Sequence, residues 1–96
     1  MNDTGNLNVI GLYLTNDQIV IGHLVNSEAT IDLDNPYNLR INHEGQLEFI
    51  PYLREFTNDN IISFNMNSVI NAFAPHDKYI TKYVEIYNKE SKTLLS

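Results

Sequence analysis

The stretch Asp17-Gln-Ile-Val-Ile-Gly-His-Leu-Val-Asn-Ser-Glu-Ala-Thr-Ile-Asp-Leu-Asp34 is rich in β-formers and is about three times as long as an ordinary strand. We interpret it as two strands of a small barrel, joined by the polar turn Asn26-Ser27-Glu28, after which strict alternation resumes. Gly22 lacks a Cβ, so the first strand can bend sharply there, as it must when a small sheet curls onto itself. The side chains expected to point into the barrel are Ile19, Ile21 and Leu24.

The chain of 96 residues is one domain by its length, and its 43% hydrophobic content is ordinary for a globular protein. The core of so short a chain is small, so association between copies would help to stabilise it. The sequence contains no cysteine, which excludes disulfides and thiolate chemistry. The start Met1-Asn-Asp-Thr lacks the features of a signal peptide, and no apolar run reaches the ~20 residues of a membrane span. We therefore expect a cytoplasmic protein that does not enter a membrane.

Charge is distributed unevenly along the chain. Residues 1–77 carry ten acidic side chains against two arginines, a formal charge of −8. The last nineteen residues hold all the lysines together with two glutamates, a formal charge of +2. An acidic body repels the phosphates whose neutralisation supplies most nucleic-acid affinity, so electrostatic contact with RNA is expected only at the lysines. These are Lys78, Lys82, Lys89 and Lys92.

The regions flanking the central run contain further strand signals. Residues 1–6 are polar and expected to be disordered, whereas residues 7–14 predict a first strand. The turn Thr15-Asn16-Asp17 follows, because Asn and Asp tolerate the positive φ of tight hairpin turns. Pro36 is expected to end the central run, since proline cannot donate to a β-ladder.

Two more strand pairs are predicted beyond the central run. Residues 37–41 and 46–50 alternate with period two around a glycine-containing turn and predict an extra hairpin. Residues 51–60 are polar and turn-rich, and predict a flap over one mouth of the barrel. Residues 61–73 predict two closing strands, separated near Asn67-Ser68.

Pro75 marks a change from strand to helix periodicity. Proline suits the first turn of a helix, and Asp77 places a negative charge at the positive end of the helix dipole. We expect an amphipathic helix over about 76–89 within a segment 75–90, followed by a flexible tail at 91–96. Its apolar stripe is Ile80, Tyr83, Val84 and Tyr87.

Two runs within this element order are distinctive: Phe49-Ile-Pro-Tyr-Leu-Arg-Glu-Phe-Thr-Asn-Asp-Asn-Ile-Ile-Ser-Phe64 and the later Tyr87-Asn88-Lys89. With the glycine-bent strand, they make residues 7–90 resemble the Sm, LSm and Hfq proteins, and most closely the small LSm-like proteins of tailed phages, cyanophages included. The resemblance implies a strongly bent, five-stranded antiparallel barrel over residues 7–74, with an extra hairpin in its variable region and a C-terminal amphipathic helix. It also implies a homo-oligomeric ring of roughly five to seven subunits that threads single-stranded RNA through its pore or along its rim.

The same resemblance assigns RNA-site positions to this chain. Without gaps, the first Sm motif begins at Gly22, and Thr30 falls where an aromatic residue or histidine stacks on a base. Asp32 then stands where an asparagine reads the base, and Asn65-Met66 where the second motif has Arg-Gly. All the RNA-contacting residue types are therefore replaced, which predicts a degenerate uridine site.

A gapped alignment is the alternative. It places Asp34–Leu39 on the first motif and restores the motif's asparagine as Asn38. We prefer the ungapped alignment, because the gapped one lengthens the bent strand and its turn.

Other chemistry finds little support in the sequence. His23, His43 and His76 have no metal-ligand spacing, so no metal site is predicted. Asp32 and Asp34 lie on one side of a strand, which is typical of a solvated face. Phosphate loops, dinucleotide glycine patterns and nucleophile motifs are missing from the sequence, so we expect neither an enzyme nor a cofactor.

Two functions of different classes remain. The first is a phage-type Sm-like ring that binds single-stranded RNA weakly or serves as an RNA-associated scaffold. The second is a homo-oligomeric interaction or structural module without RNA binding, whose C-terminal helix docks a phage or host protein. The resemblance favours the first and the acidic body favours the second. If the chain is phage-encoded, its compartment is the cytoplasm of an infected cell.

Overall fold

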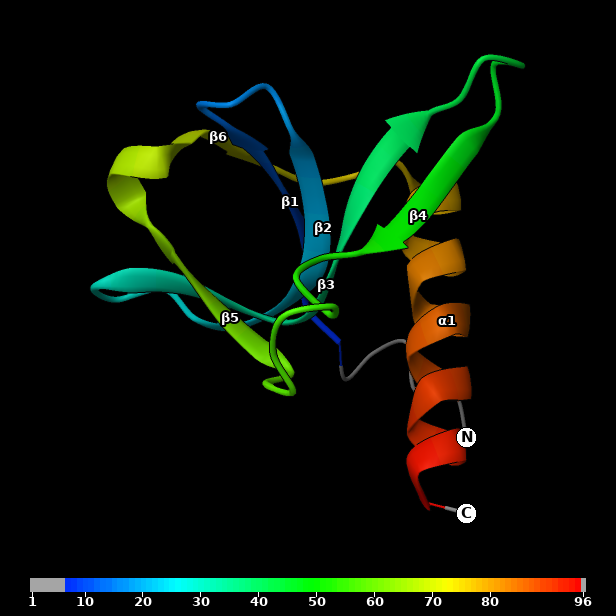
Figure 1. Ribbon diagram of the computed structural model, residues 1–96. Helices are drawn as coiled ribbons and strands as arrows, with labels where there is room; N and C mark the ends of the chain where they lie inside the picture. The colour runs from blue at the N-terminus through cyan, green and yellow to red at the C-terminus, as the bar shows by residue number, and fades with distance from the viewer. Residues whose placement is uncertain (1–6, 96) are drawn as a thin grey trace.

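The computed structural model describes residues 7–95, with side chains described as far as residue 90. This part of the chain forms six strands and a C-terminal helix (Figure 1). The strands are β1 (Val9–Leu14), β2 (Ile19–Asn26), β3 (Thr30–Ile41), β4 (Leu47–Pro51), β5 (Ile61–Asn65) and β6 (Val69–Phe73). The 3₁₀ turn η2 (Met66–Ser68) joins β5 to β6, and α1 spans Asp77–Leu95. The prediction of a mostly β protein with a C-terminal helix is confirmed, while the disorder predicted for residues 1–6 lies outside the described residues.

The strands form one antiparallel sheet in the order β4-β3-β2-β1-β6, with β5 also paired to β3. The long strand β3 has two partners in succession along one edge: residues 30–34 pair with β5, and residues 37–41 pair with β4. Figure 1 shows the sheet strongly curved, with β5 and β6 meeting only through η2. Among the described residues β5 and β6 do not pair, so the sheet is not closed into a barrel.

The prediction that Pro36 ends the central strand is wrong. The register between β2 and β3 shifts opposite Gly22, and Asn35 has a φ of 51°, so β3 contains an irregularity where proline is tolerated. The missing N–H of Pro36 falls where β3 changes partner from β5 to β4, while its carbonyl accepts the Tyr52 N–H at 3.0 Å. The two segments predicted on either side of the proline are therefore one strand.

Two apolar clusters lie on the two faces of the sheet. The sheet curls around the first cluster, which is built from β1, β2, β3 and β5. Its buried members are Leu12, Leu14, Val20, Ile31, Leu33 and Phe64. The second cluster lies between the sheet and α1, and its buried members are Ile21, Tyr37 and Tyr83. The helix therefore completes a core that the strands alone leave open.

The inward-facing residues of β2 were predicted only in part. Leu24 packs against the first cluster as predicted. Ile21 is fully buried, but on the opposite face, under α1, because Val20 takes the position inside the curled sheet. Ile19 shares the face of Ile21 but is 36% exposed, so its predicted inward orientation is wrong.

The predicted amphipathic helix is present and carries the predicted apolar stripe. Tyr83 and Val84 are buried, and Ile80 and Tyr87 are half-buried. The helix is longer than the predicted segment 75–90, because residues 91–95, predicted as a flexible tail, continue its backbone. Figure 1 shows α1 lying along one side of the sheet, beside β3 and β4.

Candidate functional site

Three of the positions that the resemblance assigns to an RNA site meet where β3 and β5 pair. Thr30 lies opposite Asn65, and Asp32 lies opposite Ser63. The Thr30 hydroxyl donates to Oδ1 of Asp32 at 2.6 Å, and the Asn26 amide donates to Oδ2 at 3.2 Å. The hydroxyl is therefore committed to the carboxylate.

Donors around Asp32 hold the pKa of this carboxyl below its ordinary value. In order of effect, these donors are Thr30, Ser63 and Asn26. Asp32 therefore stays ionised at neutral pH, and the site presents a negative charge where a uridine reader needs both a donor and an acceptor. This arrangement disfavours a phosphate-bearing ligand at the end of β5.

The end of β5 is shaped by Asn65. Its side-chain oxygen accepts the Asn67 N–H at 2.9 Å, which caps the turn η2. Met66 begins that turn and is 42% exposed. The side chain of Asn65 therefore holds the β5–β6 connection. Asn65 and Met66 supply neither the guanidinium nor the glycine that the second Sm motif has at these positions.

Asn38, the asparagine of the gapped alignment, lies in another part of the sheet. It pairs with Val20 of β2 and Ile50 of β4, in the half of β3 that does not contact β5. The structure therefore brings Asn65 beside Thr30 and not beside Asn38.

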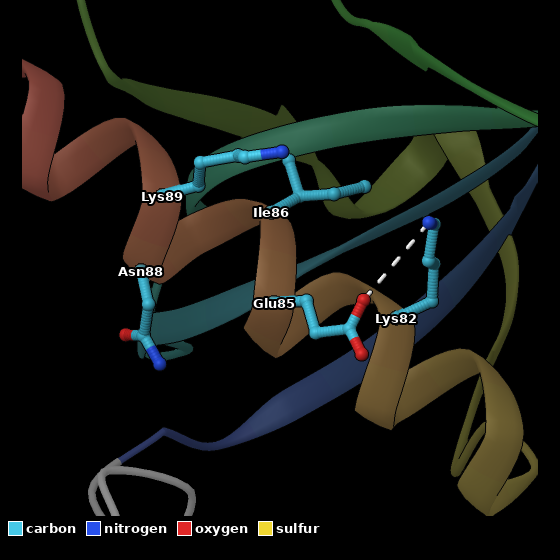
Figure 2. A pocket seen from close by; sticks show the side chains of 5 residues that line it. All are labelled: Lys82, Glu85, Ile86, Asn88 and Lys89. Carbon is cyan, nitrogen blue, oxygen red and sulfur yellow. Dashed lines mark ion pairs between the residues drawn. The ribbon is translucent and has the colours of Figure 1, made fainter.

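The lysines form a separate surface on α1. Lys82 and Lys89 line a shallow hollow together with Glu85, Ile86 and Asn88, and Figure 2 shows these side chains along one flank of the helix. The Lys82 ammonium lies 4.0 Å from the Glu85 carboxylate, and the Lys78 ammonium lies 5.2 Å from the centre of the Tyr79 ring. The side chain of Lys92 lies outside the described residues.

The lysine surface and the β3–β5 site are not contiguous. Figure 1 shows α1 and the turn between β2 and β3 on opposite sides of the sheet. A single ligand therefore meets both surfaces only if it spans the body of the molecule or contacts more than one copy.

The interpretation of the sequence missed a polar network between α1 and the sheet. The Arg54 guanidinium donates to Oε1 of Glu90 at 2.9 Å and to the Asn35 side chain, and the Tyr37 hydroxyl donates to the same glutamate. The Tyr83 hydroxyl donates to the backbone oxygen of Asp34 at 2.7 Å. These contacts tie the helix to the irregular part of β3.

A second aromatic contact extends this network along the helix. The Tyr87 hydroxyl donates to Oδ2 of Asp34 at 2.7 Å, and its ring meets His23 edge-on. Burial and this carboxylate raise the pKa of Tyr87 to about 12. The partners are 53 residues apart in sequence, so the only signal for this network was the spacing of tyrosines on the apolar stripe.

Glu90 is a carboxylate of this network whose pKa is shifted. Burial disfavours its charged form, but donors from Arg54 and Tyr37 and the arginine charge outweigh that effect and lower its pKa below the ordinary value of 4.5. Its ionised form therefore stabilises the docked helix.

We expect Glu90→Gln to lower the free energy of unfolding at neutral pH by about 1 kcal/mol or less, because solvent screens a partly exposed ion pair. The wild-type advantage is fully present above pH 4.5 and is lost as the pH falls through the lowered pKa of folded Glu90. Urea unfolding of the wild type and of Glu90→Gln between pH 7 and pH 3 measures this difference in the free energy of unfolding. Glu85→Gln, an exposed glutamate on the same helix, is the control. A wild-type advantage that shows no decrease between pH 7 and pH 3 would contradict this assignment.

A scan against protein-family models and a search of curated proteins found no match to this sequence. Within the described part of the chain, no group of three or more acidic, histidine or cysteine side chains is placed to hold a metal ion. A search of the described helices found none with the length and apolar character to cross a membrane.

Proposed function

We propose that this protein is a homo-oligomeric ring module of the Sm-like type, in which the curled, unclosed sheet takes the place of a closed barrel. The observation that carries the proposal is the open ends of the sheet: in the described chain, β5 pairs only with β3, and β6 pairs only with β1. Unpaired strand edges offer backbone donors and acceptors to another chain. Exposed apolar side chains on these two strands are Ile61 and Ile70, and Met66 is exposed in the turn η2 between them.

Pairing of β5 in one copy with β6 in the next satisfies both edges by one contact. Such a contact is heterologous, so it closes into a ring when the rotation between copies divides a full turn. The resemblance to phage LSm-like proteins supplies the expected size of roughly five to seven subunits. Association also supports a chain whose own core is small.

This assembly is tested by its mass in solution. We expect light scattering at micromolar concentration to give a mass several times that of one chain. Ile70→Lys places a charge on the exposed edge strand β6 and should shift the mass to that of one chain. Ile41→Lys, an equally simple change of an exposed isoleucine on the β3–β4 hairpin, is the matched control and should leave the mass unchanged. A wild-type mass of one chain would overturn the proposal.

Within such a ring we favour a scaffold role over uridine recognition. The ionised Asp32 would repeat around the ring beside the capping Asn65, which repels phosphate and offers no stacking surface. The second candidate function is the binding of RNA by the lysines of α1, because these cations lie together on one helix.

Oligouridine binding should therefore be weak and strongly salt-dependent. Each missing stacking contact costs on the order of 1–3 kcal/mol, and the acidic body adds repulsion. Fluorescence anisotropy should show tighter binding for Asp32→Asn combined with Asn65→Arg, and no binding when all four α1 lysines are alanine. Tight wild-type binding that survives loss of the lysines would show that the β3–β5 site recognises RNA after all.

A further inference from the structure

A groove of about 450 Å³ lies between the β3–β4 hairpin and the first turns of α1. Its apolar floor comes from the hairpin and from one helical tyrosine, and two lysines stand at its rim. The floor residues are Ile41, Leu47, Phe49 and Tyr79, and the lysines are Lys78 and Lys82.

The hairpin end of the groove is uncovered. Ile41 and Leu47 are paired across the hairpin, and they are 69% and 36% exposed. The next pair towards the sheet, Leu39 and Phe49, shares this face and packs against the second cluster under α1. Figure 1 shows the hairpin projecting past the beginning of the helix, which explains why the first pair has no cover.

The charge at the rim is opposite to that of the rest of the molecule. Lys78 and Lys82 are exposed cations on a chain of net charge −6. Lys82 is only loosely paired, since its ammonium is 4.0 Å from Glu85 and both side chains are well exposed. An apolar floor beside two ammonium groups complements a ligand that carries both apolar and carboxylate side chains.

The groove also runs beside an unpaired strand edge. Within the described residues β4 pairs with β3 alone and forms one end of the sheet. An extended peptide that adds to such an edge gains backbone hydrogen bonds, and alternate side chains fill the adjoining pockets. This edge is distinct from β5 and β6, so its use does not depend on the ring.

We propose that this groove binds an extended acidic segment of a partner protein as an additional strand along β4. Apolar side chains of the segment cover Ile41 and Leu47, and its carboxylates meet Lys78 and Lys82. The strand edge favours a peptide over a nucleic acid, because backbone pairing along β4 requires a peptide backbone.

The probe is a capped synthetic peptide of about eight residues, long enough to pair with the whole of β4. Its sequence repeats Leu-Thr-Glu-Thr. Leucine and glutamate therefore follow one another along one face of the extended peptide, and threonine occupies the other face. A control peptide carries lysine in place of glutamate. Fluorescence polarisation with the full chain should show saturable binding of the acidic peptide and none of the basic one.

Variants locate the site. Lys78→Glu combined with Lys82→Glu should weaken binding by at least about tenfold, because both charge contacts become repulsive. Ile41→Ser should also weaken it, while its exposed position spares the fold. Arg40→Glu reverses a charge on the other face of the same hairpin and should leave binding unchanged. Bound peptide should slow amide hydrogen exchange in β4.

Several results would overturn the proposal. One is no binding of the acidic peptide, and another is equal binding of the basic peptide. A third is binding that resists the lysine reversals. Self-association that Ile41→Ser abolishes, without peptide binding, would assign the groove to a second copy. Oligouridine that binds the same two lysines while the peptide does not would assign it to nucleic acid.

Discussion

A chain that ends at Ala74, without α1, is expected to lose its cooperative thermal transition and to aggregate. Removal of the helix exposes Ile21 and Tyr37, which are buried beneath it, and deletes the buried Tyr83 and Val84. Each large apolar side chain contributes about 1.5–3 kcal/mol when buried. The sum is comparable to the whole stability of a small domain, about 5–15 kcal/mol. Circular dichroism melts and binding of a hydrophobic dye measure the loss.

Point variants in the full chain separate packing from hydrogen bonding. Tyr83→Ala should cost about 3–5 kcal/mol, as expected for truncation of a fully buried aromatic side chain. Tyr83→Phe keeps the ring but leaves the Asp34 carbonyl and the His23 N–H without this hydroxyl, and should cost on the order of 1–3 kcal/mol.

Thr81→Ala, an exposed change on the same helix, serves as the control for these variants. An unchanged melt after removal of α1 would show that the helix does not complete the core. Equal losses for Tyr83→Phe and Tyr83→Ala would instead assign the whole effect to the hydroxyl.

The sequence predicted those parts of the fold that depend on residues close to one another in the chain. The turn before β2 was identified from Asn and Asp, and Asp17 has the positive φ of 67° that such turns require. The two strands at residues 61–73 were separated at the polar Asn67-Ser68, where η2 lies. The helix followed from its apolar stripe, whose spacing is a local property.

The errors arose where burial depends on distant segments. Val20 and Ile21 are both fully buried, because the curled sheet covers one and α1 covers the other, so alternation could not assign the faces of β2. The loss of a ladder donor at Pro36 predicts a strand end, but β3 continues through it. Proline is tolerated there because the strand changes partner, and only the assembled sheet creates that change.

In the candidate sites, too, local features were predictable, whereas features that depend on distant segments were not. Register places Thr30 opposite Asn65, two positions that the resemblance had grouped from separate motifs. The hydrogen bonds that commit the Thr30 hydroxyl and the Asn65 amide depend on side-chain geometry that no spacing reveals. The groove beside β4 combines a hairpin and a helix whose lining residues are at least 29 positions apart, from Phe49 to Lys78, so neither segment alone indicated it.

Substitution of Gly22 by alanine is expected to destabilise the protein by about 1–3 kcal/mol, the usual cost of overpacking a core. A Cβ at this position would lie 3.0 Å from the Cβ of Leu33 and 3.3 Å from the Cα of Pro36. Neither atom can move by a simple side-chain rotation, because one is at the base of a buried side chain and the other is backbone. The strain should therefore open the contact between β2 and the irregular part of β3.

Gly11→Ala is the matched comparison in the adjacent strand. Its Cβ would also meet a neighbour closely, but that neighbour is the outer end of the Phe73 ring. The ring is only half-buried and can rotate away, so we expect a smaller loss. For a domain of this size, Gly22→Ala should lower the melting temperature by at least about 4 °C. A melting temperature of Gly22→Ala equal to that of the wild type would show that the bend at Gly22 tolerates a side chain. A loss for Gly11→Ala as large as that for Gly22→Ala would show that movement of the Phe73 ring does not relieve the contact at Gly11.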